Sequence, residues 1–174
     1  MTGKADSPAE FIIIAYGANL PSPAFGSPAE TCLAALMELE ARGVKIVRRS
    51  PFYESAPLPV SDQPWYVNGV ARVETALNPE ALLAVLHETE RRFGRIRREL
   101  NEARVMDLDL IAYGRQVREA PPPILPHQRM ADRAFVLLPL RDIAPGWVHP
   151  VTGLTVEDLI AGLPPGQQIR RAAD

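Results

Sequence analysis

The segment VMDLDLIAY at 105–113 limits most strongly how this chain can fold. Its acidic residues alternate with apolar ones, and in a β-strand residues two apart share a face. Asp107 and Asp109 would therefore project together, with Cα atoms about 6.5–7 Å apart. The apolar positions would pack into the core on the opposite face; they are Met106, Leu108 and Leu110. The segment predicts a sheet that carries two carboxylates on one face.

Length and composition indicate a soluble globular protein. A chain of 174 residues fits one domain or at most two small ones, and 47% hydrophobic with 23% charged residues is ordinary for that class. The net charge of -2 argues against a basic nucleic-acid coat protein. The single cysteine, Cys32, is expected in the core, and it fits a reducing compartment. We expect a cytoplasmic protein without a membrane or nucleic-acid partner.

Caps and apolar periodicity divide the chain into alternating strands and helices. Ser27-Pro28-Ala29-Glu30 is a capping box, and Asn78-Pro79 opens a second helix that Gly94 ends. A proline-rich loop occupies 50–64, and a short helix follows Thr155. The expected strands are Phe11–Tyr16, Val44–Arg49, Trp65–Leu77, Val105–Tyr113 and Arg133–Leu140.

This order predicts an α/β fold, an α+β sandwich with a ferredoxin-like β-α-β-β-α-β core, an antiparallel sheet and a C-terminal extension. We expect a flexible N-terminal tail over residues 1–10, a single domain over 11–164 and a C-terminal tail over 165–174.

The acidic pair lies next to an arginine-rich stretch. A divalent cation would relieve the repulsion between the two carboxylates, and hard oxygen ligands suit Mg²⁺. Arg95 and Arg97 follow the helix end at Gly94, and Arg104 stands three residues before Asp107. Arginines beside a metal-binding acid pair are typical of phosphoryl transfer. The alternatives are two solvated aspartates and an exposed loop in which the arginines pair with nearby glutamates.

Two further segments carry aromatic and polar residues together. Tyr66 and Asn68 share a strand face, which suits a flat heterocycle because the ring stacks and the amide reads donors and acceptors. His127 lies in a loop that leads to Arg133 and Phe135. The alternative is structural: an aromatic residue at the core edge and a histidine with satisfied hydrogen bonds.

Seven motifs follow one another along the chain: AYGANL at 15–20, SPFYESAPL at 50–58, DQPWYVNGV at 62–70, GRIRR at 94–98, RVMDLDLIAYG at 104–114, LPHQRM at 125–130 and RAFVLLPL at 133–140. In this order and spacing they resemble the 6-hydroxymethyl-7,8-dihydropterin pyrophosphokinase family of folate biosynthesis. The resemblance runs from about Phe11 to Pro164. It implies a transferase that binds ATP and two Mg²⁺ ions, moves the pyrophosphoryl group to the hydroxymethyl group of the pterin, and releases AMP.

The resemblance also implies roles for individual residues. The metal ligands would be Asp107 and Asp109, which with Arg95 and Arg104 would form the catalytic group. ATP would be contacted by Glu90, Arg97, His127 and Arg133. The pterin would be bound by Ser55, Leu58, Tyr66, Asn68 and Phe135. The implied partners are these two small molecules, and we expect a monomer.

Two other functions fit parts of the pattern. An RNA-binding module of the same topology would need exposed aromatic residues on a basic sheet face. A different Mg²⁺-dependent nucleotide enzyme, such as a nucleotidyltransferase, would use the same acid pair but release pyrophosphate instead of AMP.

Overall fold

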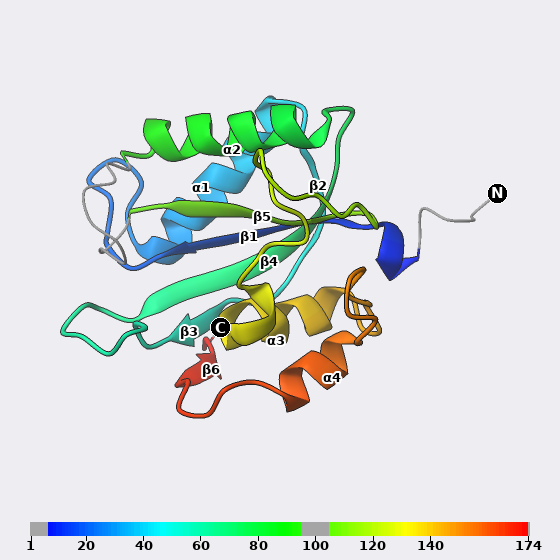
Figure 1. The fold of residues 1–174 in the computed structure, drawn as a ribbon. Coiled ribbons are helices and arrows are strands. Elements are labelled where there is room, and N and C mark those ends of the chain that lie inside the picture. Colours follow the sequence, from blue (N-terminus) through cyan, green and yellow to red (C-terminus); the bar gives the residue numbers. More distant parts are fainter. Residues whose placement is uncertain (1–6, 95–104, 174) are drawn as a thin grey trace.

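The computed structural model describes residues 7–94 and 105–173 of the chain (Figure 1). The elements are the short 3-10 helices η2 (Pro8–Glu10) and η3 (Met130–Asp132), the strands β1 (Ile12–Ala18), β2 (Lys45–Arg49), β3 (Tyr53–Ser55), β4 (Tyr66–Glu74), β5 (Asp107–Tyr113) and β6 (Ile169–Arg171), and the helices α1 (Pro28–Ala41), α2 (Pro79–Arg92), α3 (Ala134–Ile143) and α4 (Val156–Ala161).

The sheet has the predicted ferredoxin-like topology. Its strand order is β5-β1-β4-β3-β6, β2 pairs with β4 next to β3, and every pairing is antiparallel. The four strands of the core are, in chain order, β1, β2, β4 and β5. β5 neighbours β1, and β4 lies between β1 and β2. This order confirms the predicted β-α-β-β-α-β arrangement.

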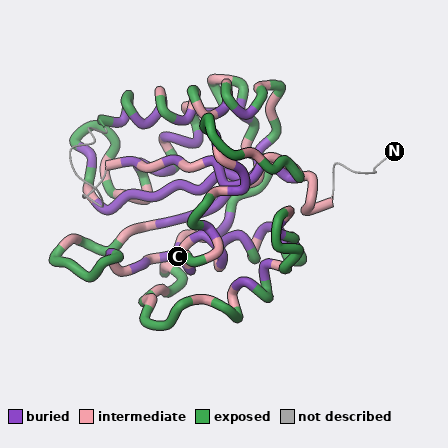
Figure 2. The backbone as a smooth tube through the Cα atoms, in the orientation of Figure 1, coloured by how far each residue is buried: buried purple, intermediate pink, exposed green. Residues whose placement is uncertain are grey.

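Helices cover both faces of the sheet. α1 and α2 lie on one face, and α3 and α4 of the C-terminal extension lie on the other (Figure 1). The first core layer contains Leu39 and Leu86 with Leu108 of the sheet, and the second contains Trp147 with Ile111. Buried residues run along the central strands and recur on the helices that cover them (Figure 2). An RNA-binding module of this topology reads RNA on an open sheet face. Here α3 and α4 cover that face.

The predicted helix starts are confirmed. Ser27 Oγ accepts a hydrogen bond from the Glu30 amide, and the Glu30 carboxylate accepts one from the Ser27 amide, so the capping box before α1 is complete. At the start of α2, Asn78 Oδ1 accepts a capping hydrogen bond from the Ala81 amide. Cys32 on α1 is buried in the first core layer, as predicted. Within the described ranges, no helix has the length and apolar character needed to cross a bilayer.

The strand predicted at Arg133–Leu140 is wrong, because these residues begin helix α3. The run AFVLLPL is apolar throughout, and such a run fits a buried strand and a buried helix equally well. The structure buries Val136, Leu140 and Ile143, which lie at helical spacing, against the sheet. The closing layer therefore comes from a helix instead of a further strand.

Residues 165–174, expected as a C-terminal tail, contain β6. This strand pairs with β3, which itself lies inside the segment expected as a proline-rich loop. Each strand is three residues long and too short to show an alternating pattern. A hydrogen-bonded ion pair between Arg170 and Glu54 at 2.8 Å joins the two strands on their exposed side.

Tyr16 and Gly69 form a tight cross-strand pair in the centre of the sheet. They lie directly opposite each other on β1 and β4. A Cβ atom at position 69 would lie 2.4 Å from a carbon of the Tyr16 ring. The ring is buried and also contacts Phe52 edge to face, so moving it aside would disturb packed neighbours. The packing of the sheet therefore favours glycine at this position.

We expect Gly69→Ala to lower the free energy of unfolding by about 1–3 kcal/mol, the usual cost of overpacking a core. Gly162→Ala is the matched control, because its Cβ would meet no atom closer than 3.7 Å and its φ of -94° suits any residue. Urea unfolding of both variants measures the difference. Equal stability of the two variants would contradict the packing argument.

Candidate active site

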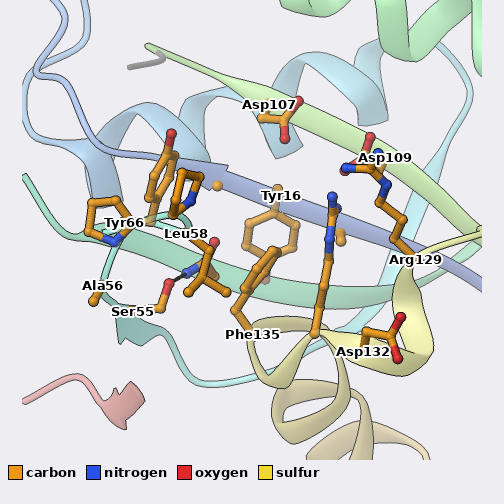
Figure 3. Close-up of a pocket in the computed structure, with 16 residues that line it drawn as sticks. Tyr16, Ser55, Ala56, Leu58, Tyr66, Asp107, Asp109, Arg129, Asp132 and Phe135 are labelled. Atoms are coloured by element: carbon orange, nitrogen blue, oxygen red, sulfur yellow. Dashed lines mark hydrogen bonds between the residues drawn. The ribbon is translucent and has the colours of Figure 1, made fainter. Parts of the chain in front are cut away.

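A cavity of about 460 Å³ opens on the face of the sheet that α3 covers (Figure 3). Its volume lies within the usual range for small-molecule sites. Eight of the predicted site residues line it: Ser55, Leu58, Tyr66, Asn68, Asp107, Asp109, Arg133 and Phe135. These residues come from three strands, a loop and the start of a helix.

The strand register brings the polar residues of the cavity together. Gly17 on β1 lies opposite Asn68 on one side and Asp107 on the other, and Ala15 lies opposite Asp109. Residues directly opposite each other on neighbouring strands share a face. A Cβ at position 17 would lie 2.7 Å from Asn68 Oδ1, so glycine leaves the space between the amide and the carboxylate. The small residues of β1 therefore form the floor of the cavity.

The acid pair is arranged as predicted. Asp107 and Asp109 are half-buried and both line the cavity, while Leu108 between them is only 1% exposed and packs in the opposite core layer. In the described part of the chain, no group of three or more His, Cys, Asp or Glu residues could hold a metal. Two carboxylates that leave other positions to water and phosphate oxygens are the donor set that Mg²⁺ uses with nucleotides. The residues therefore fit Mg²⁺.

Glu90 lies behind the acid pair instead of in the cavity. It is 3% exposed, and its Oε2 accepts a hydrogen bond of 3.0 Å from the backbone amide of Leu108. Among the residues that the structure describes, β5 is an edge strand that pairs with β1 alone, so the outward-facing Leu108 amide has no strand partner there. Glu90 therefore fixes the backbone between Asp107 and Asp109.

Arg129, Asp132, Arg133 and His127 lie near the charged end of the cavity, which is the end that carries Asp107 and Asp109. Arg133 lies over the ring of Phe135, with its Cζ 5.4 Å from the ring centroid. Arg129 and Asp132 also line the cavity, although the sequence pattern predicted no role for them. Arg129 precedes the short helix η3 and Asp132 ends it, so their position between His127 and Arg133 is the signal that could have found them.

His127 stands beside the cavity and is neutral at pH 7. Its backbone amide donates to the Ile111 carbonyl at 2.9 Å, and its Nδ1 accepts from the Arg129 amide at 3.1 Å. Burial is the main cause that lowers the pKa of its imidazole to about 4; Arg133 and Arg129 lower it further, and Asp107 acts in the opposite direction. His127 is not among the lining residues, so a contact with a ligand would be made from the rim.

The opposite end of the cavity suits a flat, polar-edged molecule. Asn68 Nδ2 donates a hydrogen bond of 2.6 Å to Ser55 Oγ, and both residues are buried. Tyr66, Leu58 and Phe135 surround this pair, whereas Asp107 and Asp109 lie towards the other end (Figure 3). The cavity therefore joins an aromatic, amide-lined end to a charged end.

The predicted residues Arg95, Arg97 and Arg104 lie outside the described residues. Their assigned contacts stay predictions. The described chain reaches Gly94 on one side and resumes at Val105, two residues before Asp107.

Comparisons with known proteins agree on one family. The family model described as 7,8-dihydro-6-hydroxymethylpterin-pyrophosphokinase (HPPK) matches residues 13–145. The 2-amino-4-hydroxy-6-hydroxymethyldihydropteridine pyrophosphokinase of Pseudomonas aeruginosa is 39% identical over 154 residues, which cover 88% of this chain and 91% of that protein. The folic acid synthesis protein fol1 of Pneumocystis carinii is 39% identical over 84% of this chain, but the match spans only 19% of its length.

A solved structure agrees at the level of the fold. Plasmodium falciparum HPPK-DHPS aligns with a TM-score of 0.65 at 14% sequence identity, over 87% of this chain and 45% of that chain. The matched family model covers most of the chain, including the strand that carries Asp107 and Asp109. The chain belongs to the 7,8-dihydro-6-hydroxymethylpterin-pyrophosphokinase family.

Proposed function

We propose that this protein transfers the pyrophosphoryl group of ATP to the hydroxymethyl group of 6-hydroxymethyl-7,8-dihydropterin, releases AMP, and thereby serves folate biosynthesis. One observation carries the proposal. The acid pair and the aromatic, amide-lined end open into the same cavity, so a heterocycle with a reacting hydroxyl and a polyphosphate can meet there. The family membership and the names of the relatives support the same reaction.

The pterin is proposed to occupy the end of the cavity that Asn68 and Ser55 line. The hydrogen bond from Asn68 to Ser55 holds the amide in one orientation, which leaves Oδ1 to read a donor on the ring edge. Tyr66, Leu58 and Phe135 supply apolar surface against the ring faces. Binding the ring at this end directs its substituent towards Asp107 and Asp109.

ATP is proposed to bind at the charged end. Asp107 and Asp109 would hold Mg²⁺, two ions in the proposed complex. When bound, the metal neutralises charge on the phosphate oxygens and lowers the pKa of the attacking hydroxyl. Arg133 faces the cavity and is proposed to bind the phosphates together with Arg95, Arg97 and Arg104.

The residues behind the cavity are proposed to act indirectly. Glu90 would keep the two aspartates in place through the Leu108 amide, and would affect ATP binding in that way. Neutral His127 would offer a hydrogen bond from the rim. Positioning and electrostatic stabilisation would then supply most of the rate. We also propose that the protein works as a monomer in the cytoplasm, where its single cysteine would stay reduced.

The assay for this proposal incubates the protein with ATP, Mg²⁺ and hydroxymethyl-dihydropterin. We expect AMP to form only when the pterin is present. Asp107→Asn should lower kcat by about 100-fold or more, because a metal supplies several kcal/mol of charge stabilisation in the transition state. Glu119→Gln is the matched control, since it removes one exposed carboxylate from a residue that does not line the cavity.

Three results would contradict the proposal. Release of pyrophosphate instead of AMP would indicate a nucleotidyltransferase. AMP formation without the pterin would indicate hydrolysis. Full activity of Asp107→Asn would remove this carboxylate from the metal site.

Asn68→Ala should mainly weaken pterin binding. The change removes the amide that faces the cavity but leaves Asp107 and Arg133 unchanged. We expect the KM for the pterin to rise about tenfold, which corresponds to about 1.4 kcal/mol for one or two lost hydrogen bonds. The KM for ATP, measured in the same series, serves as the internal control. An equal rise in both constants would argue for a general distortion of the sheet.

The low pKa of His127 predicts how stability depends on pH. In the folded state the pKa is lowered from 6.5 to about 4, so the unfolded chain binds the proton more tightly. The stability that results is present in full above pH 6.5 and is lost as the pH falls towards 4. We expect the free energy of unfolding to decrease less steeply between pH 6.5 and 4.5 in His127→Gln than in the unmodified protein. An unchanged slope in His127→Gln would contradict the lowered pKa of this imidazole.

A further inference from the structure

The side chain of Gln167 makes hydrogen bonds to the backbone on both sides of Arg133. Its Nε2 donates to the Asp132 carbonyl at 2.9 Å, and its Oε1 accepts from the Ala134 amide at 2.9 Å. A longer contact of 3.4 Å runs from Nε2 to the Pro164 carbonyl. The side-chain amide therefore holds the peptide groups on both sides of Arg133 from a position 34 residues further along the chain.

The hydrogen bond with Gln167 satisfies the Ala134 amide, which the Arg133 side chain does not cap. The first amides of a helix have no partner inside the helix, and the residue before the helix normally caps them with its side chain. Arg133 occupies this position for α3 but makes no capping hydrogen bond. Its side chain lines the cavity instead. Gln167 therefore supplies an acceptor at the helix start while Arg133 faces the cavity.

Gln167 is itself anchored to the opposite wall of the cavity. The carbonyl of the next residue, Gln168, accepts a hydrogen bond of 3.0 Å from the Ala56 amide. β6 then continues the pairing with β3, where Ile169 lies opposite Ser55. Ser55 and Ala56 line the aromatic, amide-lined end of the cavity. The segment that carries Gln167 is thus joined to the wall across from Arg133, and it sets the position of that arginine relative to the wall.

We propose that Gln167 is a positioning residue for Arg133 and thereby for the phosphates of ATP. This inference rests on the proposed function, in which Arg133 binds those phosphates. Phe135 is less dependent on Gln167, because it lies within α3, whose amides at Val136 and Leu137 bond to the Arg133 carbonyl and whose apolar face packs on the sheet. Loss of Gln167 should therefore weaken ATP binding more than pterin binding.

The test compares Gln167→Met with Gln168→Met. Methionine keeps the length of the side chain but makes neither hydrogen bond, and Gln168 offers the same chemical change at an exposed neighbouring position. We expect Gln167→Met to raise the KM for ATP about tenfold, as for the loss of two neutral hydrogen bonds, and to leave the KM for the pterin within about twofold. Gln168→Met should leave both constants unchanged.

A second variant and a double-mutant cycle complete the test. Gln167→Glu keeps the acceptor for Ala134 but loses the donor to Asp132, and should also raise the KM for ATP selectively; it replaces Gln167→Met should that variant not fold. In an Arg133→Met background, Gln167→Met should raise the KM for ATP by less than about twofold, since the guanidinium that it positions is gone.

The outcomes separate this inference from the proposed function. Three results for Gln167→Met would overturn its positioning role while the enzyme remains a pyrophosphokinase. They are equal increases in the KM for ATP and the KM for the pterin, an unchanged KM for ATP, and an effect on the KM for ATP that is fully additive with that of Arg133→Met. Absence of pterin-dependent AMP formation in the unmodified protein would instead overturn the proposed function itself.

Discussion

The site depends on the register between β1 and its two neighbours. Along the face that α3 covers, three neighbouring strands change from polar or small residues to larger apolar ones. β5 changes from Asp107 and Asp109 to Ile111, β4 from Asn68 to Val70, and β1 from Gly17 and Ala15 to Ile13. At the apolar end, α3 and Trp147 pack on the sheet; at the polar end, the cavity remains. A slip of one residue in β5 would turn the two carboxylates into the opposite core layer. Correct pairing of β1 and β5 is thus a condition for having a site at all.

The sequence predicts this arrangement where a pattern extends over enough residues. Alternation in 105–113 correctly places Leu108 in the core and Asp107 in the cavity, and capping signals correctly start α1 and α2. β3 and β6 cannot be predicted in this way because three residues contain no period. α3 is missed because a wholly apolar run does not distinguish a helix from a strand. Arg129 and Asp132, which line the cavity, are missed because the short η3 segment has no repeating pattern that predicts which way its side chains face.

Backbone hydrogen bonds help to hold the charged segments around the cavity. Buried Glu90 fixes the Leu108 amide between the two carboxylates, and the Arg129 amide donates to His127 Nδ1 in the segment that leads to Arg133. The field of Asp107 also extends through the sheet. It adds to burial in raising the pKa of the Cys32 thiol to about 12, which makes this cysteine an unreactive core residue.

Some of the residues that support the site do not line it. Gly69 accommodates the Tyr16 ring, Glu90 supports the acid pair, and Gln167 brackets Arg133, yet none of the three lines the cavity. Each acts over a separation of 18 residues or more along the chain. Such contacts form only when the whole fold is complete, so the substrate-facing groups reach their positions together. A reaction that depends on aligning a hydroxyl, a metal and a polyphosphate needs this kind of preorganisation, because small displacements of the reacting groups reduce the rate steeply.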